Sequence, residues 1–502
     1  MRGRRWGIAA VAAGALTSGS LVALPAEAGT GPGAFYGQRV QWHGCALNAD
    51  DTAGTELDAA GAQCADITVP LDYRRPGRRT ITVAVSRIKA TDPAHRIGPL
   101  MINLGGPAIP VRDIIDDAAA AMGPTGAKFD LIGMDVRFSG RSTPIDCGWP
   151  ASWIPRSAGA DRESFDRMVA LSKDLAKRCG RTSGDLLAHA SSANIARDMD
   201  VVRAVLGAPR LSYLGYSYGS YIGAMYTQLF PRNAGRIVLD SAIDPQDAGV
   251  HLRDAQGFEK RDALREWATL AAGADGQLGL GDTPEKVLGV IDGIYAAAAR
   301  TPLKVGRYEV DDTVMPALLV DNLADDNEEN ALQLASFVVQ LRTAADTGRV
   351  TPDEALEAAV AGIVGGARSA FHSGQTAIEC ADAAVPRSVE WYRRDVGSRR
   401  AADPLFGTLN RVNPCAFWPA APAPVVRIGN GTPALIVHAD GDLDATPALN
   451  RRMHAALTGS RLVTLNGART HGVYLFRGDG CVDATVNAYL DTGALPAADL
   501  TC

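Results

Sequence analysis

The 502-residue sequence predicts an α/β fold, in which a mostly parallel sheet carries helices on both faces and is interrupted by a mainly helical insertion. Two observations predict this arrangement. Short apolar runs alternate with segments of helical periodicity between residue 67 and about residue 245. Strand-like runs then return only after residue 425. The sheet is therefore expected to begin in the first half of the chain and to be completed near its end.

The expected strands are short apolar or alternating runs, and they cover residues 81–85, 99–104, 129–135, 211–214, 237–240, 434–438 and 461–465. The expected core helices cover residues 193–206, 221–230 and about 481–490. Residues 246–425 are rich in Ala, Leu, Asp, Glu and Arg, which predicts a helical cap. The first part of the core is accordingly expected at 36–245 and its C-terminal part at 426–502.

The N-terminus predicts a signal peptide over residues 1–28. Arg2, Arg4 and Arg5 precede an apolar run, which ends at the small-x-small motif Ala26-Glu27-Ala28. A membrane anchor is the alternative, but the run is only weakly hydrophobic, and no other run could span a bilayer. Removing residues 1–28 takes away three Arg and one Glu and changes the net charge from −6 to −8. This charge does not favour nucleic acid or an anionic membrane as a partner.

The eight cysteines all follow the predicted signal peptide, and their even number in an exported chain predicts disulfides. Their spacing favours four local loops, although connectivity does not follow from sequence alone. No CxxC pair or Cys/His cluster indicates a metal site.

One serine lies between two glycines in the stretch Gly215-Tyr216-Ser217-Tyr218-Gly219. An expected strand precedes it and an expected helix follows it. This strand–turn–helix context is typical of a nucleophile elbow, which exposes the serine at the positive end of a helix dipole. We therefore predict that Ser217 is a nucleophile rather than a buried serine of a tightly packed turn.

A serine hydroxyl needs a general base, and in elbow enzymes the acid and the histidine follow the serine in chain order. His471 follows an expected strand and is the predicted base. The other seven histidines lie before the elbow, in or beside the insertion, within a strand or on a helix. The acid is expected in the loop after residues 434–438, which contains Asp440, Asp442 and Asp444.

Further motifs make nearly all of the chain after the signal peptide resemble the secreted tripeptidyl aminopeptidases of actinomycetes, within the proline-iminopeptidase-like family of α/β-hydrolases. These motifs are Gln63-Cys64-Ala65-Asp66-Ile67-Thr68-Val69-Pro70-Leu71-Asp72-Tyr73, Asp135-Val136-Arg137, Gly140-Arg141-Ser142-Thr143-Pro144, Ala196-Arg197-Asp198-Met199-Asp200, Ala377-Ile378-Glu379-Cys380-Ala381-Asp382, Thr446-Pro447 and Thr470-His471-Gly472. The resemblance implies an α/β-hydrolase fold whose helical insertion limits access to chain ends.

The acid loop departs from the pattern of the family. Relatives usually place the acid five residues beyond the strand valine and three before Thr-Pro. Counting from Val437 gives Asp442, whereas counting back from Thr446 gives Leu443. We favour Asp442 because the strand determines where the loop begins, and Asp444 is the alternative. Asp440 is expected to be an ordinary loop carboxylate.

The oxyanion loop also departs from the family sequence Asn-Pro-Gly-Gly-Pro-Gly-Gly-Ser-Gly. Here it reads Asn103-Leu104-Gly105-Gly106-Pro107-Ala108-Ile109-Pro110. Because the Gly-Gly-Pro core is kept, a backbone N–H near Gly106 is expected to pair with that of Tyr218 as the oxyanion hole. The later glycines are lost and Pro110 has no N–H, so a stiffer loop, a narrower leaving-group side or a weaker activity is expected.

The resemblance also implies the disulfide pairing, which follows chain order: Cys45–Cys64, Cys147–Cys179, Cys380–Cys415 and Cys481–Cys502. Each bridge is expected to stabilise the fold by about 3–4 kcal/mol.

The leading functional interpretation is a secreted serine exopeptidase that acts on peptides and needs no metal or organic cofactor. A carboxylesterase with the same triad is the alternative, and a non-catalytic binding protein on a hydrolase scaffold is a third. Glu379 and Asp382 flank Cys380 in a family motif, and we expect them to bind the ammonium group of the substrate. Their alternative role is structural, in capping a helix or pairing with an arginine. The sequence indicates no oligomeric state.

Overall fold

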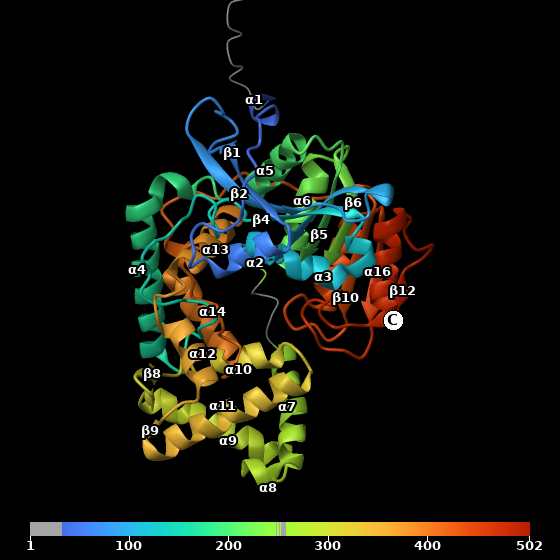
Figure 1. Cartoon of the computed structure of the whole chain (residues 1–502). Helices are drawn as coiled ribbons and strands as arrows, with labels where there is room; N and C mark the ends of the chain where they lie inside the picture. The colour runs from blue at the N-terminus through green and yellow to red at the C-terminus, as the bar shows by residue number, and fades with distance from the viewer. Residues whose placement is uncertain (1–32, 247, 250–251, 253–257) are drawn as a thin grey trace, which may run out of the picture.

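The computed structural model describes residues 33–246, 248–249, 252 and 258–502 (Figure 1). The predicted signal peptide lies outside the described residues. Among the described helices, none combines the length and the apolar character that crossing a bilayer requires.

A nine-stranded sheet forms the centre of the fold, in the order β1-β2-β4-β3-β5-β6-β10-β11-β12. Strands β1, β2 and β4 pair antiparallel, and every other neighbouring pair in this sheet is parallel. The bounds of these strands are β1 Gln63–Pro70, β2 Thr80–Ile88, β3 Gly98–Asn103, β4 Phe129–Met134, β5 Leu211–Tyr216, β6 Ala234–Asp240, β10 Ala434–Ala439, β11 Ser460–Leu465 and β12 Leu500–Thr501. The predicted strands are therefore present, with ends that differ by at most three residues.

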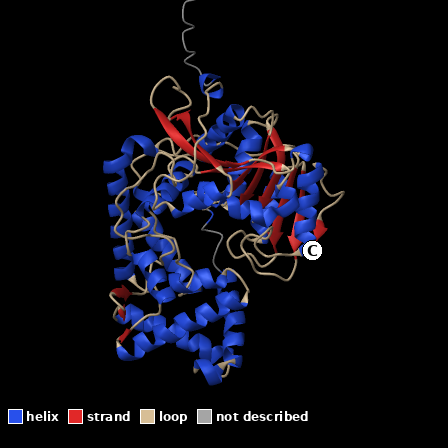
Figure 2. Cartoon of the chain, in the orientation of Figure 1, coloured by secondary structure: helices blue, strands red, loops and turns tan. Residues whose placement is uncertain are grey.

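Helices cover both faces of this sheet, as Figure 2 shows. Every residue of β10 is buried, and successive side chains point to opposite faces of the sheet. Ile436 accordingly belongs to one apolar cluster, while Leu435 and Val437 belong to another. Helices α5 and α6 pack in the first cluster, and α3 and α16 in the second. The core helices are α1 Gly33–Tyr36, α2 Thr52–Ala59, α3 Ile115–Gly126, α5 Ser192–Val205, α6 Tyr218–Leu229, α15 Pro447–Ala456 and α16 Gly480–Thr492. This architecture confirms the predicted α/β-hydrolase fold class.

Much of the inserted segment shares one apolar cluster, which also includes Leu443 of the acid loop, and this part of the segment lies beside the sheet (Figure 1). Its helices are α7 Phe258–Gly273, α8 Asp275–Leu278, α9 Pro284–Arg300, α10 Ala317–Val320, α11 Glu328–Thr347, α12 Glu354–Val364, α13 Ser369–Asp382 and α14 Val389–Ala402. It also contains a small sheet in the order β8-β7-β9, with bounds β7 Leu303–Val305, β8 Tyr308–Val310 and β9 Arg349–Val350.

One long helix outside the expected cap also packs against it. Helix α4, Arg162–Leu187, is absent from the predicted elements and runs from the sheet toward the cap in Figure 1. Phe165 and Met168 of α4 share an apolar cluster with Tyr392 and Val396 of α14. The cap is therefore supported by residues that precede the insertion in the sequence. Four short 3₁₀ turns complete the described elements: η1 Pro93–His95, η2 Arg112–Ile114, η4 Asp321–Leu323 and η5 Pro414–Phe417.

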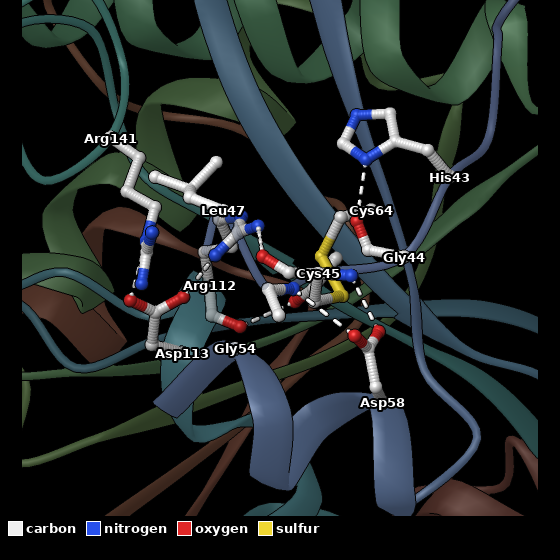
Figure 3. The surroundings of a disulfide bond; sticks show 12 residues. His43, Gly44, Cys45, Leu47, Gly54, Asp58, Cys64, Arg112, Asp113 and Arg141 are labelled. Carbon is white, nitrogen blue, oxygen red and sulfur yellow. Dashed lines mark hydrogen bonds and ion pairs between the residues drawn. A yellow bond between two sulfur atoms is a disulfide. The ribbon is translucent and has the colours of Figure 1, made fainter. Parts of the chain in front are cut away.

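Four disulfides join the eight cysteines in the pairing that the resemblance implies. Figure 3 shows the first of them, Cys45–Cys64. Beside it, the Cys45 carbonyl accepts a hydrogen bond of 2.9 Å from the buried guanidinium of Arg112. Arg112 begins η2, directly after the oxyanion loop, and its N–H donates to Asp135 at 2.9 Å. The disulfide-bonded N-terminal segment is thereby connected to the end of the oxyanion loop.

Candidate active site

Ser217 lies at the sharp turn between β5 and α6. Its backbone has φ 51° and ψ −122°, a conformation that non-glycine residues rarely adopt. The flanking glycines make the turn possible. A Cβ at Gly215 would lie 2.6 Å from the Gly219 carbonyl oxygen, and one at Gly219 would lie 2.7 Å from the Asn103 carbonyl oxygen. The geometry is that of a nucleophile elbow.

His471 and Asp442 are hydrogen-bonded partners. The Nδ1 atom of His471 lies 3.0 and 3.1 Å from the two carboxylate oxygens of Asp442. Asp442 is buried and also accepts the N–H groups of Asp444 at 2.8 Å and Ala445 at 2.9 Å. These bonds orient the carboxylate toward Nδ1, so Nε2 is left for proton exchange with a hydroxyl. Ser217 and His471 line the same cavity.

The electrostatic surroundings of His471 favour its protonated form. Burial by itself would lower the pKa of His471, but the charge of Asp442 and its hydrogen bond raise that pKa to about 9. Asp444 and Asp240 contribute further negative charge. The arrangement can therefore stabilise an imidazolium.

The other two carboxylates of the loop have different partners. Asp444 forms an ion pair of 3.1 Å with Lys260, a buried lysine of α7. Asp440 accepts the Gly467 N–H at 3.0 Å. Of the three aspartates, Asp442 is therefore the one that the structure brings to the histidine, while Lys260 connects the cap to the neighbouring Asp444.

The oxyanion loop packs directly against the elbow. Gly105 has φ 83°, and a Cβ there would lie 2.4 Å from the Tyr216 carbonyl oxygen and 2.9 Å from the Tyr218 nitrogen. Gly106 and Tyr218 both line the cavity, as the predicted pair of oxyanion donors requires. The amide of Gln375, on α13, donates to the Gly106 carbonyl. Pro110 is exposed, and it is not among the described residues that line the cavity.

The cavity has a volume of about 570 Å³ and lies between the sheet and the cap. The core contributes Ser217, Tyr218 and His471, and the cap contributes residues of α7 and α10–α13. Its charged lining residues are Lys260, Asp321, Arg368, Glu379 and Asp444. Sequence reasoning missed Gln375, Lys260 and Asp321, since no motif marks them and only the packing of the cap brings them to the cavity.

The structure separates the two acids proposed from the α13 motif. Glu379 is buried, lines the cavity and lies 3.4 Å from the Gln375 amide. Asp382 is not among the described lining residues. Its oxygens accept from the Ser192 N–H at 2.8 Å and the Tyr218 hydroxyl at 2.7 Å. Ser192 is the first residue of α5, so Asp382 caps this helix and also holds the ring of Tyr218 in place. This is the structural role that the sequence analysis gave as the alternative for the two acids.

The described residues include one group with metal-ligand spacing, Asp479, Cys481 and Cys502. The two sulfurs of this group are joined in a disulfide, so neither is available as a thiolate ligand.

A mostly parallel sheet, a serine on the elbow after β5, and a His–Asp pair in the loops after β11 and β10 together define a serine hydrolase of the α/β-hydrolase fold. A family model described as "TAP-like protein" matches residues 403–502. The chain is 33% identical over 462 residues to the tripeptidyl aminopeptidase of Streptomyces lividans, covering 88% of this chain and 83% of that protein. The chain belongs to the tripeptidyl aminopeptidase family of α/β-hydrolases.

Two further relatives carry different names. The serine protease Hip1 of Mycobacterium tuberculosis is 30% identical over 507 residues, covering 93% of this chain and 91% of that protein. Carboxylesterase B of the same organism is 29% identical over 500 residues, covering 95% and 92%. The chain is thus similar both to proteins named as peptidases and to one named as an esterase.

Proposed function

We propose that this protein is a secreted aminopeptidase that releases short peptides, tripeptides by analogy with its Streptomyces relatives, from the N-termini of peptides. The observation that carries the proposal is the position of Glu379, a buried carboxylate in the same cavity as Ser217 and His471. A cap carboxylate near the nucleophile gives a hydrolase the means to select a free amine, which an esterase does not need.

The proposed reaction follows the triad pattern. The Oγ atom of Ser217 attacks the peptide carbonyl while Nε2 of His471 takes its proton, and Asp442 holds the ring and balances its charge. Backbone N–H groups near Gly106 and of Tyr218 stabilise the oxyanion. The leaving amine takes the proton from His471, and water then hydrolyses the acyl-enzyme through the same base. No step calls for a metal or an organic cofactor.

Glu379 fits an ammonium ligand for a physical reason. A carboxylate is costly to bury, and a substrate cation would offset that cost with a charge-assisted hydrogen bond. Gln375 lies between Glu379 and the oxyanion loop, because its amide also contacts the Gly106 carbonyl. Glu379 is therefore connected through one amide to the loop that would bind the oxyanion.

Export is part of the proposal. The predicted signal peptide and four disulfides in one chain both fit an oxidising compartment outside the cytoplasm. N-terminal sequencing of protein recovered from culture medium should begin after Ala28, and an intact Met1 would contradict export by cleavage.

The test compares a tripeptide p-nitroanilide with its N-acetylated form. We expect the wild type to prefer the free amine by about 10–100-fold in kcat/KM, the value of a hydrogen bond to a charged group. Glu379→Gln should reduce this preference. The control Glu390→Gln removes an exposed carboxylate of α14 and should keep it. Equal rates on both substrates in the wild type would overturn the aminopeptidase proposal.

A carboxylesterase is the second candidate, favoured by the similarity to carboxylesterase B along almost the whole chain. Faster turnover of a short acyl ester than of the peptide anilide, with no effect of Glu379→Gln on either, would support it. A non-catalytic role predicts instead that a fluorophosphonate does not label Ser217.

A further inference from the structure

Two adjacent residues at the end of β6, Asp240 and Ser241, take no direct part in the proton transfers described above. Strand β6 lies between β5, which leads to Ser217, and β10, which leads to Asp442. Both residues are fully buried. Ser241 has φ 48°, a left-handed backbone that non-glycine residues rarely adopt. Such a conformation usually persists only where the surrounding contacts require it.

Asp240 and Ser241 contact both the nucleophile turn and the histidine loop. The Asp240 carbonyl accepts the Ser217 N–H at 3.0 Å. The Asp240 carboxylate accepts the N–H of Val473 at 3.0 Å and of Tyr474 at 2.8 Å. The Ser241 hydroxyl accepts the N–H of Gly472 at 2.8 Å. The three residues that directly follow His471 are thus all bonded to this pair.

We infer that Asp240 is a positioning residue that, together with Ser241, holds His471 in register with Ser217. The inference rests on the proposed function, since it concerns the proton transfer between those two residues. Asp240 acts through its neighbours and contacts no reacting atom.

A carboxylate suits this position because it only accepts hydrogen bonds. Val473 and Tyr474 are fully buried, so their N–H groups would be left unpaired without it, which is costly in a protein interior. Asparagine has nearly the same shape, but it offers one acceptor oxygen and turns an NH₂ group toward the donors. Asp240→Asn should therefore loosen the histidine loop without creating a cavity.

Asp240 also adds to the field at the imidazole. The groups that face His471 are Asp442 and Asp444 from the loop after β10 and Asp240 from β6. Burial, together with the negative charge of Asp442, raises the pKa of Asp240 to about 7, against the lowering effect of hydrogen bonds from Tyr474, Val473 and Ser241. Above that pH Asp240 is an anion beside the histidine loop, and its removal should lower the pKa of His471.

The experiment measures the rate at which a fluorophosphonate labels Ser217 between pH 5 and pH 10, because this readout is independent of the substrate. We expect the plateau rate at high pH to fall about 100-fold in Asp240→Asn, because a general base that is displaced from the nucleophile accepts its proton less efficiently. The midpoint of the rise should also move to lower pH. Ser241→Ala removes one of the three bonds to the histidine loop, and its plateau labelling rate should be about tenfold lower than that of the wild type.

The matched control is Asp200→Asn. Asp200 of α5 is equally buried and accepts hydrogen bonds from Arg203 and Asn233, at 2.7 Å each. This variant should lower the melting temperature but keep the plateau rate and the midpoint. If Asp240→Asn and Ser241→Ala lose melting temperature like the control and label at the wild-type rate, the inference is wrong. If Asp240→Asn does not fold, the melting temperature and the labelling rate of Ser241→Ala test the inference in its place.

The test does not depend on the substrate class. Labelling of the wild type but not of Ser217→Ala identifies the nucleophile whether the protein proves to be a peptidase or an esterase. A negative result in the aminopeptidase assay would therefore count against the proposed function only, whereas wild-type labelling rates in the Asp240 and Ser241 variants would count against the positioning role only.

Discussion

Asp442 and Asp444 are two residues apart, and their surroundings differ sharply. Asp442 is buried against Nδ1 of His471, whereas Asp444 is half-buried and paired with Lys260. Only the first can hold the imidazole in the tautomer that leaves Nε2 as the base. The two carboxylates should therefore differ in their effect on turnover.

We expect Asp442→Asn to lower kcat by about 10⁴-fold, the loss that follows when a triad acid no longer selects the tautomer. Asp444→Asn removes a charge that faces the imidazole ring but removes no hydrogen bond to the ring. It should therefore lower kcat by about tenfold or less. Steady-state kinetics on the tripeptide anilide measure both variants. A larger loss in Asp444→Asn would show that the acid has been assigned to the wrong residue.

The His471–Asp442 pair also predicts a pH dependence. A general base must be neutral to accept a proton, so with a pKa of about 9 for His471, kcat/KM should rise through the alkaline range. The folded pKa lies above the ordinary 6.5, so the pair stabilises the fold fully below about pH 6.5, and this stabilisation is lost as the pH rises through about 9. Melting curves of the wild type and His471→Ala should differ least at alkaline pH. A rise centred near pH 6.5 would contradict this prediction.

At the scale of elements, the oxyanion loop and the elbow are built against each other. Gly105 touches Tyr216 and Tyr218 so closely that a methyl group has no room, and its φ of 83° disfavours any side chain. The backbone around Gly106 therefore depends on a glycine at the preceding position. The glycines that this loop lacks by comparison with the family lie beyond it, toward Pro110.

We expect Gly105→Ala to reduce kcat by about 100-fold or more, because it moves the oxyanion donors away from the elbow. Gly98→Ala is the matched control at the other end of β3. Gly98 also has a positive φ, 140°, but a Cβ there would meet no described heavy atom within 4 Å. The control should lose stability and keep kcat, and kcat measured beside melting temperature separates the two effects. Equal loss of kcat in both variants would refute a specific role for Gly105.

Across the whole molecule, the cavity depends on how the cap is attached to the core. The Cys147–Cys179 disulfide joins α4 to the segment around Cys147, which contacts α13. There the Cys147 N–H donates to the Ser373 hydroxyl at 3.2 Å, and the Trp149 N–H donates to the Ser369 hydroxyl at 2.7 Å. Helix α13 in turn carries Gln375 and Glu379 into the cavity.

Replacing Cys147 and Cys179 by Ser should lower the free energy of unfolding by about 3–4 kcal/mol. It should also raise KM, because α13 loses its support. The Cys481–Cys502 bridge, with a sequence separation of 21, ties α16 to the end of the chain beside the edge strand β12. Replacing both of these cysteines by Ser should cause a similar loss of stability with an unchanged KM. Guanidinium unfolding and steady-state kinetics measure both effects. An unchanged KM in the Cys147/Cys179 variant would show that α4 does not support the cavity.

Local patterns in the sequence determined the parts that depend on nearby residues. Short apolar or alternating runs predicted seven strands of the central sheet, because strands that are buried on both faces have nearly continuous apolar sequences. The elbow around Ser217 followed from two glycines between a strand and a helix, and His471 from its place after a strand. The cysteine spacing favoured four local loops, and the pairing that the family resemblance implied is the one observed.

Tertiary structure alone decided what depends on contacts between distant segments. Glu379 and Asp382 lie one helical turn apart on α13, yet Glu379 lines the cavity, whereas Asp382, the last residue of the helix, bonds to Ser192 of α5. Lys260 and Gln375 reach the cavity only because the cap folds back onto the core. The three bonds from Asp240 and Ser241 join residues more than 230 positions apart. Sequence spacing carries no information about such pairs, because the folding of the intervening chain sets their distance.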